Sequence, residues 1–123
     1  MKQFSSEFGS LDLVVNQRQI RAILDTGANK SIISEKLARE MGLKVKKAGS
    51  RTIVVETALV VEELPLKYCF VPIKVQNECF VLKMFVTGNL TNGIIIGRRH
   101  CCVMKIDIMF SSGKICINGT LVN

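Results

Sequence analysis

One short segment constrains the chain more than any other part of the sequence. A mainly apolar run at residues 20–24 stops abruptly at Asp25-Thr26-Gly27. The run has the length and composition of a buried strand, and Gly27 permits a sharp turn and the close approach of another backbone segment. We therefore expect one carboxylate at the end of a buried strand, where little water reaches it and its surroundings decide when it is ionised.

A second motif stands about seventy residues further on, where three consecutive isoleucines lead into Gly97-Arg98. Together with the Asp-Thr-Gly-Ala sequence that starts at Asp25, it resembles the active-site signature of the retroviral-type aspartic proteases, the retropepsin family. The resemblance extends over residues 11–117 and favours the gypsy-like LTR retrotransposon branch. It implies an all-β fold: a small, closed, barrel-like acid-protease domain with one or two short helices and one half of the active site per chain.

The size of the chain fits a single domain over residues 1–123. Residues 1–10 are expected to be either a flexible arm or, as the resemblance implies, part of a strand at a dimer interface. No run of ~18 uncharged apolar residues is present, so no membrane partner is expected, and the first residues lack the apolar core of a signal peptide. These observations predict a cytoplasmic location or, for a retroelement protein, one within a virus-like particle.

Neither a metal nor a cofactor is expected. The five cysteines are odd in number and three lie in apolar, strand-like runs, which indicates buried reduced thiols. His100-Cys101-Cys102 has no second pair with ligand spacing. No motif near His100, the only histidine, supports a nucleophile pair.

The net charge of +7, from 17 basic and 10 acidic residues, is spread along the chain with one cluster at Lys44, Lys46 and Lys47. The seven aromatic residues are not interleaved with that cluster. Either a solvated basic face or non-specific contact with nucleic acid accounts for this charge.

Hydrophobic periodicity predicts the elements that carry these motifs. In the first half we expect strands at 11–15 and 19–24, a helix at 35–41, a basic loop at 44–50 and a hairpin at 51–61. Ser34 caps the helix and Gly42 ends it. The resemblance makes the hairpin a flap over the cleft, with its tip near residues 56–58, although no glycine lies between Arg51 and Tyr68.

Pro65 is expected to break the strand pattern between the two halves. In the second half we expect strands at 68–75, 79–86, 94–96 and 114–117, a short helix at 99–104 and an extended segment at 105–110. Pro72 favours an edge or a bulge. Each half shows two strands, an apolar segment that ends at a special glycine, and a helix, but only the first half carries the acid.

Direct attack of water on a peptide bond needs a base and an acid, and two carboxylates that share one proton supply both. The other aspartates, Asp12 and Asp107, lack the following hydroxyl–glycine pair. The second catalytic carboxylate must therefore come from another copy of Asp25, which predicts a two-fold symmetric homodimer.

The resemblance assigns roles to the neighbouring residues. Catalysis involves Asp25, Thr26 and Gly27, with Thr26 bonded across the dimer axis. Arg98 and Gly97 support the active-site loop, and either Asn29 accepts a hydrogen bond from Arg98 or Arg98 pairs elsewhere. The expected substrate contacts are Gly27, Ala28, Asn29, Ile53, Val55 and Ile95; the apolar members are equally compatible with ordinary strand packing.

Three functions are compatible with these features. The first is an aspartic endopeptidase that cleaves a retroelement polyprotein. The alternative is a catalytically weak dimerisation or peptide-binding module, which the flap without glycine and Asn29 favour. The third is a cellular, domesticated or ubiquitin-pathway relative that has the same domain.

Overall fold

The computed structural model describes residues 9–56, 61–88, 90, 93–109 and 111–122. Strands dominate, and two short helices each follow directly on a strand. The elements in order are β1 (Ser10–Val15), β2 (Arg18–Asp25), β3 (Ile32–Ser34), α1 (Glu35–Glu40), β4 (Lys46–Glu56), β5 (Val61–Val75), β6 (Glu78–Thr87), β7 (Ile94–Gly97), α2 (Arg98–Val103), β8 (Ile106–Met109), β9 (Lys114–Ile117) and β10 (Thr120–Val122).

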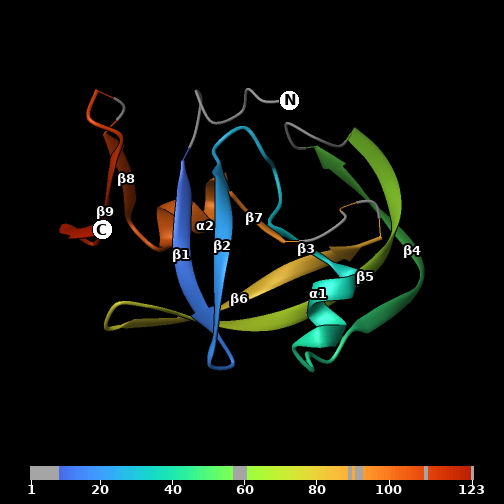
Figure 1. Cartoon of the computed structure of the whole chain (residues 1–123). Coiled ribbons are helices and arrows are strands. Elements are labelled where there is room, and N and C mark those ends of the chain that lie inside the picture. The colour runs from blue at the N-terminus through green and yellow to red at the C-terminus, as the bar shows by residue number, and fades with distance from the viewer. Residues whose placement is uncertain (1–8, 57–60, 89, 91–92, 110, 123) are drawn as a thin grey trace.

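Six strands close into a barrel (Figure 1). Their hydrogen-bonded order is β1-β2-β7-β3-β6-β5, and the pairing of Val14 with Lys74 joins β5 back to β1. β4 pairs with β5 outside this ring, and β8 to β10 form a separate three-stranded sheet. The prediction of an all-β, closed, barrel-like fold with short helices is confirmed. Neither described helix has the length and apolar character needed to cross a membrane.

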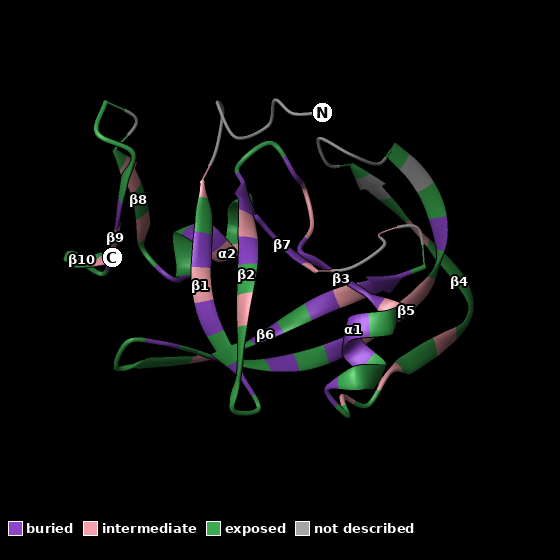
Figure 2. Ribbon diagram, in the orientation of Figure 1, coloured by how far each residue is buried: buried purple, intermediate pink, exposed green. Residues whose placement is uncertain are grey.

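Buried and exposed residues alternate along the strands, and the buried ones build the core (Figure 2). In β5, Cys69, Val71, Ile73 and Val75 are buried and the residues between them are exposed. β7 departs from this period because both of its faces are covered: Ile94 and Ile96 pack in the main core and Ile95 packs in a second apolar cluster, so all four residues of the strand are buried. The strand that leads into Gly97 is therefore buried along its whole length, as is its neighbour β3.

Turn and cap chemistry explains where the first elements begin and end. Asn16 and Gln17 have φ values of 50° and 69°, the pattern of a two-residue type I′ turn between β1 and β2. The Ser34 hydroxyl accepts a hydrogen bond from the Leu37 N–H at 3.1 Å and caps α1. Gly42, at φ 70°, ends the helix in the left-handed region. The predicted cap at Ser34 and stop at Gly42 are confirmed.

Two predicted boundaries are wrong. The expected loop at 44–50 is largely strand, because β4 already begins at Lys46 and pairs with Tyr68 of β5. Gly49, at φ 59°, lies where the register of the β4–β5 pairing shifts. A glycine at such a bulge gives the same sequence signal as a loop. Pro65 does not interrupt β5: it lies opposite Thr52 where β5 pairs with β4 alone, so its missing N–H is tolerated on the open side.

The flap hairpin is only partly described, and so is the N-terminal end of the chain, whereas the C-terminal end holds an unexpected strand. β4 and β5 form the expected antiparallel hairpin, with Glu56 opposite Val61. The predicted tip near residues 56–58 falls largely outside the described part, which lacks residues 57–60. Most of the predicted arm at 1–10 also lies outside it. β10 was not expected, although Asn118 and Gly119, at φ 52° and 83°, form another type I′ turn.

An internal two-fold relation links two strand–strand–helix units. β2 pairs in parallel with β7, β6 pairs in parallel with β3, and β3 and β7 run antiparallel beside each other. Ser34 caps α1 and pairs with Thr87, while Gly97 caps α2 and pairs with Asp25. Gly97 therefore corresponds to Ser34, not to Gly27 as the sequence pattern indicated, and Asp25 corresponds to Thr87.

Candidate active site

Asp25 is the last residue of β2 and is held by the turn that follows it. Its side chain accepts a hydrogen bond from the Gly27 N–H at 3.0 Å, and its carbonyl accepts one from the Ala28 N–H at 3.0 Å. Asp25 is only 3% exposed, whereas Thr26 and Gly27 are exposed. The turn thus presents two small residues at the surface directly beside a buried carboxylate.

Gly97 lets the β7–α2 junction pack against this loop. A Cβ at position 97 would lie 2.8 Å from the carbonyl carbon and oxygen of Lys30 and 3.1 Å from the carbonyl oxygen of Ala28. The next residue, Arg98, donates its N–H to the Ala28 carbonyl at 3.1 Å. A side chain at position 97 would therefore push residues 26–31, which join β2 to β3 and which we call the active-site loop, away from β7.

A buried serine joins the same loop to α2. The Ser31 hydroxyl accepts the Gly97 N–H at 2.8 Å and lies 2.6 Å from Nδ1 of His100. Burial, and then the charge of Arg99, lower the pKa of His100, which favours a neutral ring whose Nδ1 accepts the serine proton. Sequence reasoning missed this pair because its members are 69 residues apart; the only signal was a lone histidine three residues after Gly97.

Of the two predicted alternatives, the structure has the second: Arg98 pairs elsewhere and forms no side-chain hydrogen bond with Asn29 among the described residues. An Nη1 of Arg98 donates to the Thr26 carbonyl at 3.3 Å. Asn29 instead binds the end of β4: its Oδ1 accepts the Glu56 N–H at 3.0 Å, and its own N–H donates to the Glu56 carbonyl at 3.2 Å. Asn29 thus ties the flap strand to the active-site loop.

An apolar cluster separate from the main core lies around this loop. Its buried members are Ala28, Ile32, Leu64 and Ile95, and Ile53 packs against it from β4. The structure thus brings Ala28, Ile53 and Ile95 of the predicted contacts together. The side chain of Val55, also in β4, lies outside the described part.

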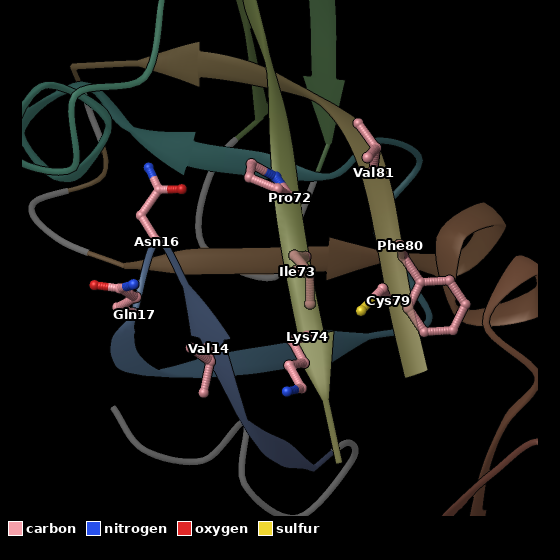
Figure 3. Close-up of a pocket in the computed structure, with 9 residues that line it drawn as sticks. All are labelled: Val14, Asn16, Gln17, Pro72, Ile73, Lys74, Cys79, Phe80 and Val81. Carbon is pink, nitrogen blue, oxygen red and sulfur yellow. The ribbon is translucent and has the colours of Figure 1, made fainter. Parts of the chain in front are cut away.

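Two pockets differ in their relation to Asp25. A pocket of about 310 Å³ includes Asn29 and Gly97 in its lining and so adjoins the active-site loop. A mainly apolar pocket of about 420 Å³ lies between the β1–β2 turn and the β5–β6 hairpin, where Val14, Pro72 and Val81 line it (Figure 3). None of the predicted site residues lines the second pocket.

No group of three or more metal-ligating side chains occurs among the described residues. All five cysteines are free; Cys69 and Cys101 are buried, and burial raises the pKa of each thiol to about 11. Cys79 and Cys102 are exposed, so the predicted burial of the thiols applies to only some of the five cysteines.

A closed barrel in which an Asp-Thr-Gly turn packs against Gly97-Arg98 defines a retropepsin-type aspartic protease. Residues 11–98 match the model of a family described as "gag-polyprotein putative aspartyl protease", and the chain belongs to this family. No curated protein sequence matches the chain significantly.

Solved structures with the same fold share little sequence with this chain. The retroviral protease-like domain of Ddi1 from Leishmania major is 14% identical over 92% of this chain and 89% of its own, with a TM-score of 0.65. The EIAV protease in complex with the inhibitor HBY-793 is 14% identical over 89% of this chain and 99% of its own, with a TM-score of 0.64. At this identity the likeness concerns the fold.

Proposed function

We propose that the chain is an aspartic endopeptidase that is active as a symmetric homodimer. In this mechanism the two Asp25 carboxylates share one proton and activate a water molecule between them, one taking its proton while the other donates to the peptide. The observation that carries the proposal is the turn itself: a buried carboxylate, fixed by the Gly27 N–H, beside two small exposed residues.

The requirement for a second chain follows from the positions of the other aspartates. Asp12 lies on β1 and pairs with Arg21 at 3.0 Å, and Asp107 lies on β8 in the separate C-terminal sheet. The position within the chain that corresponds to Asp25 is occupied by Thr87. Only another copy can therefore bring a second carboxylate of the same kind to the site.

The family description supports a polyprotein as the substrate. The peptide binds in an extended conformation between β4 and the active-site loop. Ala28, Ile53 and Ile95 provide the apolar surroundings of its side chains, and Gly27 is available to its backbone. Asn29 bonds to the peptide only in exchange for its bonds to Glu56.

The test compares the wild type with Asp25→Asn in cleavage of a mixed peptide library. Cleavage by Asp25→Asn should fall by at least about a thousandfold because the variant cannot carry the shared proton. Asp12→Asn, the matched control, should retain activity. A fully active Asp25→Asn variant would exclude the mechanism.

Mixing the two proteins tests the dimer directly. When wild type and Asp25→Asn exchange subunits in equal amounts, activity per wild-type chain should halve and total activity should fall to about one quarter of that of an all-wild-type sample. Activity that stays proportional to the amount of wild type would show that one Asp25 is sufficient.

A second candidate is a peptide-binding module with little catalysis. The observation in its favour is that the Asn29 N–H and Oδ1 are already occupied by Glu56 of β4. Tight peptide binding without cleavage supports the module, whereas specific cleavage that a statine-type transition-state mimic blocks supports the enzyme.

A further inference from the structure

The pocket beside the active-site loop is lined by three separate parts of the chain. Asn29 and Lys30 come from the loop, Lys83 from β6, and Gly97, Arg99 and His100 from the β7–α2 junction. Its volume of about 310 Å³ accommodates an amino-acid side chain. We call it the basic pocket.

Positive charge in the basic pocket is not balanced by the described residues. The four ion pairs of the described part involve Glu40, Asp12 and Glu35, and none reaches Lys30, Lys83 or Arg99. A concave site with three cations and no carboxylate favours an anionic ligand.

One of these cations is held in place by aromatic rings. The ammonium group of Lys83 lies 4.6 Å from the ring centre of Tyr68 and 5.7 Å from that of Phe85. Cation–π attraction limits the freedom of this side chain. The pocket thus has one located charge, that of Lys83, in addition to the charges of Lys30 and Arg99.

The basic pocket lies along the path of an extended peptide. Asn29 joins the active-site loop to the end of β4, and Gly97 pairs with Asp25 across β2 and β7. A peptide that runs between β4 and the loop, away from Asp25, passes Asn29. Every second side chain of such a peptide faces the same way, so one of them can enter the pocket at a distance from the bond that is cut.

We propose that the basic pocket binds an acidic side chain of the peptide substrate and thereby selects substrates with Asp or Glu at one position away from the cleaved bond. This inference rests on the proposed function, and it names the substrate class of the same site. A carboxylate suits the pocket because the guanidinium of Arg99 offers a planar pair of donors and Lys83 offers a fixed positive charge.

The test measures binding separately from cleavage. Fluorescent octapeptide pools, each with one position fixed as Glu or Gln and the others random, are titrated by anisotropy against full-length Asp25→Asn protein. We expect about five- to tenfold tighter binding of the Glu pool at one position. Lys30→Gln, Lys83→Gln and Arg99→Gln should each reduce this preference, and the triple variant should abolish it.

Lys36→Gln is the matched control, since it removes the same charge from an exposed position on α1 outside the pocket. It should leave the preference unchanged. Arg99→Glu should reverse the preference toward a pool that has Lys at the same position, which a general loss of folding does not produce.

Two outcomes would overturn the inference: no position that prefers Glu, or a preference that persists in the Lys30→Gln/Lys83→Gln/Arg99→Gln triple variant. Cleavage by the wild type is measured in parallel. Normal cleavage without a Glu preference contradicts the basic pocket alone, whereas a Glu preference without cleavage contradicts the proposed protease activity alone.

Discussion

Two corners of the barrel have the same construction and different contents. In one, β2 ends at Asp25 beside the Gly97 that caps α2; in the other, β6 ends at Thr87 beside the Ser34 that caps α1. Asp25 and Thr87 are both buried. The backbone frame is thus repeated within the chain, but the carboxylate is not, which is why the proposed chemistry needs a second molecule.

The two helix caps differ in what surrounds them. Ser34 supplies a hydroxyl to the helix N-terminus, whereas Gly97 provides no side-chain bond and instead permits contact with the backbone of Lys30. The corner that contains Asp25 therefore has close backbone packing at Gly97 where the other corner has a side-chain helix cap at Ser34. Three comparisons of variants test this difference.

The largest effect is expected for Gly97→Ala. Its Cβ would meet backbone atoms of Lys30 at 2.8 Å, and such overpacking should lower the free energy of unfolding by about 3 kcal/mol. The control is Gly88→Ala in the other corner, where the nearest atom lies at 3.9 Å at the end of the Glu35 side chain; its effect should stay within about 1 kcal/mol. Urea unfolding at one fixed protein concentration measures both, and equal losses would contradict the role of close packing.

An intermediate effect is expected for Ser31→Ala. The buried Gly97 N–H and His100 Nδ1 both lose their partner, so the free energy of unfolding should fall by about 2 kcal/mol. Ser34→Ala removes only the helix cap and should lower it by about 1 kcal/mol. The reverse order in urea unfolding would mean that the Ser31 bonds matter less than the cap.

The smallest effects are those of pH, and they separate the two corners. Hydrogen bonds from Lys67 and then Arg39 lower the pKa of Glu35 on α1 below 4.5, and burial lowers the pKa of His100 on α2 below 6.5. In each case the unfolded chain takes up the proton first as the pH falls, so the free energy of unfolding decreases. The decrease begins near pH 6.5 for His100 and near pH 4.5 for Glu35.

Unfolding from pH 8 down to about pH 3 in the Asp25→Asn background, which removes the proposed catalytic pair, should show both decreases. His100→Gln should remove the upper one and leave the lower one. An unchanged upper decrease in His100→Gln would assign it to another group.

Local chemistry in the sequence was sufficient to predict much of the fold. Alternating apolar residues, the cap at Ser34 and the isoleucines before Gly97 act over a few residues, and the predicted elements follow them. The errors at Gly49 and Pro65 have one cause: both residues resemble loop signals, but the long β4–β5 pairing tolerates them as a bulge and an open edge. Pairing between distant strands cannot be deduced from either residue alone.

The sequence predicted which residues form the candidate site, but it did not predict which of them bond to each other. Asp25 and Gly97 were identified from their motifs, and the structure places them opposite each other in β2 and β7. The bond between Ser31 and His100 and the link from Asn29 to β4 join residues 69 and 27 positions apart. Such contacts depend on how the barrel closes, which no local pattern encodes.

The link between Asn29 and Glu56 also changes what peptide recognition means for this molecule. A guest that hydrogen-bonds to the N–H or the Oδ1 of Asn29 must displace a bond that this group already makes to the main chain of Glu56, so entry is an exchange of partners with little net gain. Discrimination between guests then falls to their side chains. Short ligands that end before Asn29 leave these bonds intact. Their affinity should therefore fall below that of longer ligands by less than the number of lost contacts suggests.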